Sequence, residues 1–180
     1  LLVKFSIPAI IGMMVTASYN IIDRIFIGRG VGTLGIAGIT IGFPIMLIML
    51  AFGLLIGLGT TSLISLKLGE QKKEEAENIM GNGTVLLILI FSMISICGLL
   101  FLKPLLILFG ASDTILPYAS RYLKIILYGA IFQGIALGMN NFIRAEGNPK
   151  IAMATMLISA IINTILDPIF IFHFDMGIEG

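Results

Sequence analysis

Long apolar runs separated by short polar segments dominate this chain. Runs of more than 20 mostly apolar residues recur along the sequence, and charged residues mark the breaks between them. A membrane-spanning helix needs about 20 such residues, so each run predicts one transmembrane helix. The expected spans cover about 5–28, 39–66, 78–102, 117–142 and 151–172.

The segments between these spans carry their own expectations. Clustered glycines over 30–38 predict a loop before the second span, and the hydrophilic stretch 67–77 predicts a loop or a short surface helix. Residues 104–114 predict a short apolar hairpin. Small residues spaced four apart are typical of close helix packing in membranes, and two such pairs are Gly53 with Gly57 and Gly134 with Gly138.

Composition supports a membrane protein. Apolar residues make up 58% of the 180 residues and charged residues 12%, against about 45–50% and about 25% in soluble domains. A soluble domain of this length has too little interior to bury that much apolar surface. The net charge of +1 gives no basic excess for a nucleic acid partner. We therefore expect an all-α integral membrane protein whose partner is the lipid bilayer.

Two acids interrupt the apolar spans. Asp167 is followed at once by Pro168, which removes a backbone donor and favours a bend, and the other acid is Asp23. Counted from Lys4 and Lys150, which precede the first and fifth spans, the acids lie 19 and 17 residues along two helices that run in the same direction. At 1.5 Å per residue these are about 28 and about 26 Å, nearly the same depth in the membrane.

A carboxylate at membrane depth usually faces a protein interior or a water-filled cavity. Asp167 has Asn163 four residues before it, and Asp23 has Tyr19 and Asn20 on its own face. These positions predict an ion or proton site formed by both acids. Two alternatives stay open: Asp23 as an interfacial acid near a loop, and Asp167 as a helix-end residue with Pro168 marking the stop.

Four short motifs carry a resemblance to a known family. They are FSIP at 5–8, YNIID at 19–23, RAEGNP at 144–149 and NTILDP at 163–168. In this order and spacing the chain resembles the multidrug and toxic compound extrusion (MATE) family of transporters. The resemblance spans the whole chain.

The resemblance implies a fold. Family members look like two pseudo-symmetric six-helix lobes, twelve helices in all, around a central cavity. Residues 1–180 would supply helices one to five of the N-terminal lobe, and the sixth helix and the C-terminal lobe would be absent. We read the chain as a fragment of a multi-pass cell-membrane protein with a cytoplasmic N-terminus. The full-length chain is expected to function as a monomer.

The resemblance also implies an activity. Relatives export small cationic or amphiphilic compounds in exchange for Na⁺ or H⁺, without a cofactor and without enzymatic chemistry. The coupling residues would be Asp23, Asp167, Asn163 and Tyr19, with Asp23, Asp167 and Asn163 as ligands if the ion is Na⁺. Weaker candidates for the substrate cavity or its gating are Asn140, Asn20, Gln133 and Glu146.

Other functions remain in competition at this stage. A lipid-linked oligosaccharide flippase of the same superfamily would line its cavity with cations to meet a pyrophosphate. A channel would spread polar residues along the whole depth of a pore, and a non-transporting membrane subunit would need no ion site. An enzyme is disfavoured, because His173 is the only histidine and has no catalytic companion.

Overall fold

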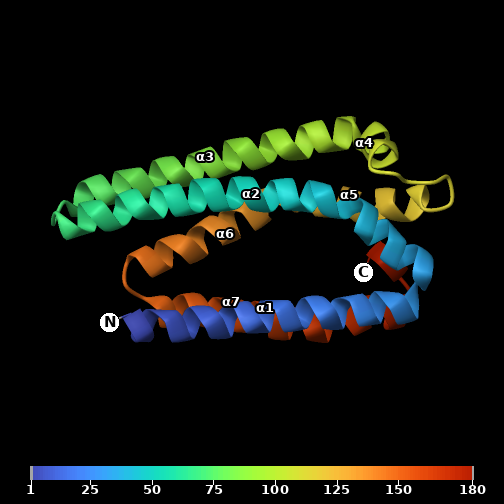
Figure 1. Cartoon of the computed structure of the whole chain (residues 1–180), viewed down its shortest axis with the longest axis horizontal. Helices are drawn as coiled ribbons and strands as arrows, with labels where there is room; N and C mark the ends of the chain where they lie inside the picture. Colours follow the sequence, from blue (N-terminus) through green and yellow to red (C-terminus); the bar gives the residue numbers. More distant parts are fainter. Residues whose placement is uncertain (1, 180) are drawn as a thin grey trace. The chain divides into compact units, whose positions relative to one another are not determined.

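The structure, a computed structural model, describes the backbone of residues 2–179 and the side chains of 6–179. Leu1, Gly180 and the side chains of Lys4 and Phe5 lie outside the described part. All regular elements of the described residues are helices, and none is a strand, which confirms the all-α prediction (Figure 1). In order they are α1 (Leu2–Gly30), α2 (Thr33–Gly69), α3 (Lys73–Leu100), α4 (Leu102–Leu108), α5 (Leu116–Tyr128), α6 (Ala130–Ala145), α7 (Pro149–Pro168), a π-helix η1 (Ile169–His173) and a 3₁₀ turn η2 (Gly177–Glu179).

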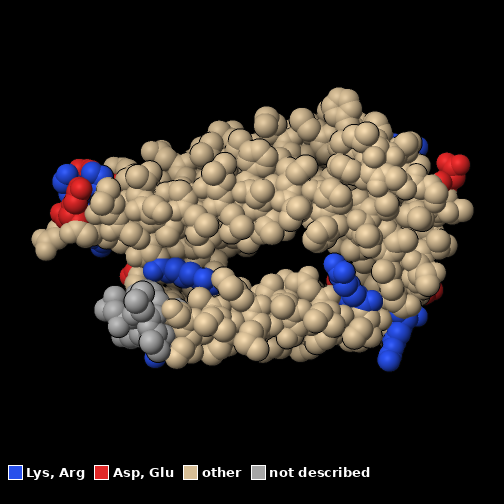
Figure 2. Space-filling model, in the orientation of Figure 1, with Lys and Arg blue, Asp and Glu red and all other residues tan. Residues whose placement is uncertain are grey.

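By length and composition, four helical segments of the described chain can cross a membrane: Ser6–Gly30, Thr33–Gly69, Lys73–Leu100 and Pro149–His173. The expected fourth span, 117–142, is broken at Gly129 into α5 and α6, and a fifth crossing results if the two are counted together. In Figure 2 the visible charged side chains lie near helix ends, and the middle of α2 and α3 shows none. Such a band suits the hydrocarbon layer of a bilayer.

The predicted glycine-rich loop over 30–38 is wrong, because α2 begins at Thr33. The break is confined to Val31 and Gly32, where Gly32 has a φ of 82° that other residues rarely adopt. Gly38 instead serves packing inside α2. A Cβ added there would lie 3.0 Å from the backbone nitrogen of Ala119, so the glycine lets α5 approach closely.

The hydrophilic segment 67–77 divides between two helices around a tight turn. α2 runs to Gly69 and α3 starts at Lys73, so the third helix begins five residues before the predicted span. Glu74 and Glu75 occupy the first turn of α3, where negative charge is favourable for the helix dipole. The charges that suggested a loop therefore help to start a helix.

The chain forms two compact units. The first comprises Leu1–Pro44, Phe101–Ile126 and Met153–Gly180, and the second comprises Ile45–Leu100 and Leu127–Ala152. The first has a core of Ile27, Ile39, Ile171 and Ile178, with Phe26, Val31, Tyr118 and Tyr122 packed against it.

In the second unit, small residues let helices approach one another closely. Gly57 of α2 faces Gly138 of α6, since a Cβ on Gly57 would lie 3.7 Å from the Gly138 Cα. Gly138 also faces Leu87 of α3, and Gly134 faces the ring of Phe91. The predicted packing role of these glycine pairs is thus confirmed within this unit.

Gly134→Ala is expected to destabilise the protein by about 1–3 kcal/mol, the usual cost of overpacking. The new Cβ would lie 2.5 Å from the Phe91 Cγ, an atom next to the backbone that cannot move aside cheaply. The measurement is thermal unfolding in detergent. Gly81→Ala on α3 is the matched control: its Cβ would meet nothing within 4 Å, and alanine favours a helix by up to about 1 kcal/mol. Equal melting temperatures for the two variants would contradict the packing role.

Candidate functional site

The buried acid of α7 carries a polar partner one turn away. Asp167 is only 7% exposed, and Nδ2 of Asn163 donates a hydrogen bond to its Oδ1 at 2.9 Å. The other oxygens, Oδ2 of Asp167 and Oδ1 of Asn163, are buried without a hydrogen-bond partner among the described residues. Buried polar atoms in proteins almost always have a partner. Two acceptor oxygens on one helix face therefore call for a cation, a proton or ordered water.

Pro168 is the last residue of α7, but it does not end the helical segment. Because proline has no N–H, it cannot donate to the carbonyl of Thr164, and the chain widens into the π-helix η1 instead of stopping. The N–H of Phe174 then donates to the carbonyl of Ile169 at 3.0 Å, five residues back. Single turns of π-helix are frequent at functional sites. Asp167 thus lies near the end of α7, which stops at Pro168 as the helix-end alternative has it, and the π-helix η1 continues the helical segment beyond it.

α1 and the segment α7–η1 lie side by side within the first unit (Figure 1). A Cβ on Gly12 would lie 2.8 Å from the sulfur of Met156, and the ring of Phe26 packs edge to face on Phe172 at 6.2 Å between centroids. These two contacts, near opposite ends of α1, show that the first and fifth predicted spans are neighbours. The depth argument required this arrangement.

Asp23 lies on α1, half-buried and two turns before the helix ends at Gly30. It is close enough to Asp167 for its charge to act on that carboxyl group. The two acids therefore lie within electrostatic range of each other on neighbouring helices. Arg24 is exposed beside Asp23 and is the nearest cation along the chain.

The other candidates on α1 have different surroundings. Tyr19 is half-buried one turn before Asp23. Asn20 is exposed, and its Nδ2 donates to the carbonyl of Thr16 at 2.7 Å, while the Thr16 hydroxyl donates to the carbonyl of Gly12 at 2.9 Å. These two side chains donate to backbone carbonyls of their own helix, whereas Oδ1 of Asn163 and Oδ2 of Asp167 have no hydrogen-bond partner among the described residues.

Sequence reasoning missed one residue of this site. Tyr122 of α5 is half-buried and lies within electrostatic range of both Asp23 and Arg24. Tyr118 and Tyr122, one helical turn apart, pack together on the core of the first unit. The four-residue spacing of these tyrosines could have indicated the residue. It lies inside the predicted fourth span, where we considered only the length of the apolar run.

The weaker candidates on α6 belong to the second unit. Asn140 donates through Nδ2 to the carbonyl of Ala152 at 2.9 Å, which ties α6 to the first turn of α7. Gln133 is half-buried on the same helix, and Glu146 is exposed just beyond its end. Glu146 lines a pocket of about 320 Å³ together with Lys73 and Glu77. The structure does not join these residues to the site on α1 and α7.

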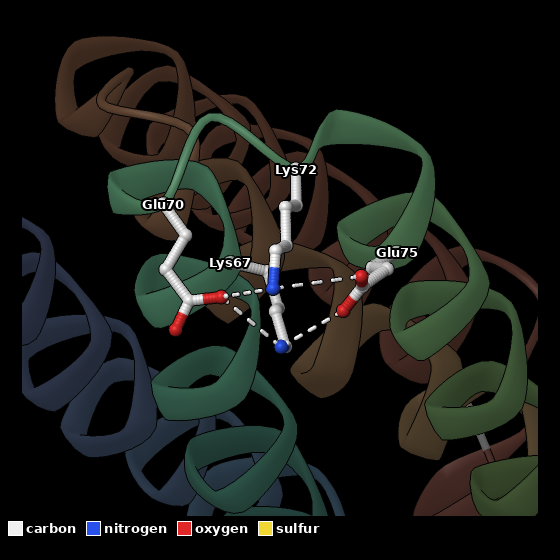
Figure 3. A network of polar contacts seen from close by, with 4 residues as sticks. All are labelled: Lys67, Glu70, Lys72 and Glu75. Carbon is white, nitrogen blue, oxygen red and sulfur yellow. Dashed lines mark hydrogen bonds and ion pairs between the residues drawn. The ribbon is translucent and has the colours of Figure 1, made fainter.

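The turn between α2 and α3 is held by crossed ion pairs (Figure 3). Nζ of Lys67 lies 3.1 Å from Glu70 and 2.8 Å from Glu75, and Nζ of Lys72 lies 3.1 Å from Glu70 and 3.8 Å from Glu75. Hydrogen bonds from Lys72, and then from Lys67, hold the pKa of the Glu70 carboxyl below its usual range. Exposed pairs of this kind contribute little individually, so we assign them the local task of closing the turn.

Acid is expected to loosen this turn. Because the pKa of Glu70 is lower in the folded turn than in an open chain, its contribution is present near neutral pH and is lost as pH falls through the folded value. Hydrogen exchange at residues 68–75, followed from pH 7 downward and corrected for intrinsic rates, should show declining protection. Glu70→Gln should lower protection already at pH 7, whereas Glu74→Gln, outside the network, should not. Identical profiles for both variants would contradict the assignment.

The donor set of the α1–α7 site consists of oxygens. No group of three or more histidine, cysteine, aspartate or glutamate side chains within residues 2–179 is arranged to hold a metal ion. Carboxylate, amide and phenol oxygens suit hard cations rather than soft transition metals. Oxygens of this kind, around buried Asp167 and half-buried Asp23, suit a proton or a small hard cation.

Comparison with known proteins places this geometry in a family context. The chain is 31% identical over 179 residues to the multidrug export protein MepA of Staphylococcus aureus and 29% identical over 171 residues to the FAD transporter of Shewanella oneidensis. These matches cover 99% and 95% of this chain but 40% and 38% of the relatives. A structure of the MATE multidrug transporter DinF-BH, solved as a complex with a ligand, has 47% identity and a TM-score of 0.91, over 98% of this chain and 40% of that one.

The chain therefore spans about two fifths of the length of its relatives. The apolar helices and these matches together show a multi-pass membrane protein. The MatE family model matches residues 8–169. That match covers the four resembling motifs except for the first residues of the opening one. This chain belongs to the MatE family, the multidrug and toxic compound extrusion proteins.

Proposed function

We propose that the chain is the N-terminal part of a secondary active transporter that exports small cationic or amphiphilic compounds in exchange for Na⁺ or H⁺. The observation that carries this proposal is the pair of acids on neighbouring helices, Asp23 on α1 and buried Asp167 on α7. An ion-coupled antiporter needs a site whose charge changes when the coupling ion is bound. The names of MepA and DinF-BH support the class of cargo.

The coupling residues in this proposal are Asp23, Asp167, Asn163 and Tyr19. Asp167 and Asn163 each offer a buried oxygen that lacks a hydrogen-bond partner, and these atoms fit a Na⁺ ion or a proton carried with water. A sodium ion would take its remaining oxygens from Asp23 or water. Asn20, Gln133, Asn140 and Glu146 are proposed, more weakly, to contact cargo or to gate the cavity.

The mechanism follows from charge neutralisation. When both carboxylates are ionised and share one site, they repel each other and need water or a cation nearby. Uptake of one coupling ion halves the charge of the site and relieves this repulsion, so α1 can shift against α7 and cargo can leave. By linkage, the ion must weaken cargo binding by the same factor as cargo weakens ion binding.

The proposal also covers the membrane in which the protein lies, its orientation there and its oligomeric state. The transporter is placed in the cell membrane with a cytoplasmic N-terminus, and the lysine-bearing turn after α2 on the inner side agrees with the charge rule. It is proposed to work as a monomer of the full-length chain. The membrane spans of this chain, with α5 and α6 counted as one, would then be five of the six of one lobe.

A second class of cargo has one specific observation in its favour. A relative covering 95% of this chain is named as an FAD transporter, and FAD is an anionic dinucleotide. Export of such a compound would need cations at the cavity. In the first unit Arg121 is already paired with Glu179 at 3.6 Å, and Arg24 is the cation next to Asp23 along the chain. A flippase for pyrophosphate-linked sugars would also need cations at its cavity, so the small number of suitably placed cations weighs against that function too.

The test uses the full-length protein in proteoliposomes. Efflux of a fluorescent organic cation is driven by a Na⁺ gradient or by a pH gradient, imposed separately, and FAD is the second cargo. Cation efflux under one gradient supports the proposal and identifies the ion. Efflux of FAD alone would move the assignment to the dinucleotide class, and no efflux of either cargo would refute the antiporter.

A further inference from the structure

A groove of about 590 Å³ runs along one face of α7, past Asp167 to Phe170. Four polar residues of its lining repeat at intervals of four: Thr155, Ser159, Asn163 and Asp167. Leu166 and Phe170 are among its apolar walls. We call these four residues the α7 polar ladder.

The spacing of the ladder suits hydrogen-bonded water. Residues four apart on a helix lie about 6 Å apart along its axis, and one water that bonds both neighbours can bridge that gap at about 2.8 Å on each side. From Thr155 to Asp167 the ladder extends about 18 Å. Thr155 and Ser159 are exposed at the open end of this line, and Asp167 is buried near the other end.

The buried end of the ladder shows that the groove needs an occupant. Asp167 is more than nine-tenths buried, and its Oδ2 has no hydrogen-bond partner among the described residues. An unsatisfied buried polar atom costs about 1–3 kcal/mol. The Asn163 Oδ1, also without a partner there, is the next oxygen along the same groove. Hydroxyl, amide and carboxylate oxygens are the ligands that hard monovalent cations and water prefer.

We propose that the α7 polar ladder is the hydrated route along which the coupling cation moves between Asp167 and the membrane side at which α7 begins. The inference rests on the proposed function and adds a path to its binding site. Ser159 and Thr155 thereby become positioning residues for the ion in transit. They do not hold cargo.

Hydration of the ladder is tested by thiol accessibility in the full-length protein. Cys97, the only cysteine of this chain, is first replaced by alanine. Ser159→Cys should then react with a small, membrane-impermeant cationic thiol reagent at least about ten times faster than Ile161→Cys. The control residue lies at nearly the same depth, about 200° around the helix from Ser159, and is 58% exposed without lining the groove. Equal rates would overturn the proposal.

Ion movement is tested separately. Thr155→Val combined with Ser159→Ala should slow ion-driven efflux about tenfold while leaving the cargo dissociation constant unchanged. Run under the Na⁺ and the pH gradient in turn, the experiment identifies which cation uses the ladder. An unchanged efflux rate, or a weakened cargo affinity at unchanged rate, would overturn the route. Failure of the unmodified protein to export under either gradient would refute the proposed function, and the thiol result would still decide whether the groove is hydrated.

Discussion

Replacing Asp167 by asparagine is expected to reduce ion-driven export at least about 100-fold, a loss of about 2.7 kcal/mol of coupling. An asparagine cannot exchange a proton or carry charge, so the site would stay neutral throughout the cycle. The side chain keeps nearly the same volume, and Asn163 can still form a hydrogen bond with its oxygen. Folding and membrane insertion should therefore be retained.

The measurement is efflux from proteoliposomes, with cargo binding measured in parallel. Because the neutral side chain mimics the ion-loaded state, Asp167→Asn should bind cargo with the weaker affinity of that state, and this affinity should no longer respond to the coupling ion. Asp113→Asn, an exposed acid between α4 and α5, is the matched control and should transport normally. Ion-dependent efflux that persists in Asp167→Asn would remove this residue from the coupling site.

The sequence predicted that the first and fifth spans are neighbours, which the structure confirms, but it misplaced several helix boundaries. Asp23 and Asp167 stand out because an acid in an apolar span is costly. The equal depth of the two acids followed from residue counts along parallel helices. Their nearness then required only that α1 and α7 be neighbours, which Gly12 against Met156 and Phe26 against Phe172 show.

Glycine explains the boundary errors. Gly32 breaks the chain with a positive φ, whereas Gly38 lies inside α2 and admits α5. A sequence without alignment does not separate these two uses, since both need the missing side chain. Gly129 shows the opposite error, because a break lies where one continuous span was predicted.

Side-chain partners were the least predictable part. Asn140 and Asn163 are both asparagines on membrane helices, yet the first donates to the backbone carbonyl of Ala152 and the second to the carboxylate of Asp167. Tyr122 was missed because its partners come from α1, far away in sequence. Such assignments depend on which helices pack together, and hydrophobic periodicity carries little information about that in a chain that is apolar nearly throughout.

The π-helix after Pro168 links local chemistry to the conformational step of the proposed mechanism. A widened turn directly after the coupling acid leaves backbone groups less tightly engaged than an α-helix does. η1 packs on the end of α1, where Gly30 meets Ile171 and Phe26 meets Phe172. A change of charge at Asp167 thus occurs next to a contact between the two helices that the proposed mechanism moves.

Asn163→Leu is expected to give the second largest loss, about 10- to 100-fold in ion-driven export. The substitution removes the donor to the Asp167 Oδ1 and the neighbouring unpaired oxygen at once, and hydrogen bonds to charged groups contribute about 1.5–3 kcal/mol. The ion concentration that half-saturates export should rise by a similar factor, which a purely structural role would not cause.

Asn163→Gln tests the same residue conservatively, because it keeps the amide group on a longer stem and should restore part of the ion affinity. Asn82→Leu, on the exposed face of α3, applies the same substitution outside the site and should leave export unchanged. If Asn163→Leu lowers only the melting temperature and leaves the half-saturating ion concentration as it was, the amide stabilises α7 and does not hold the ion. If that concentration rises and Asn163→Gln recovers it, the two unpaired oxygens of α7 act together as the coupling site.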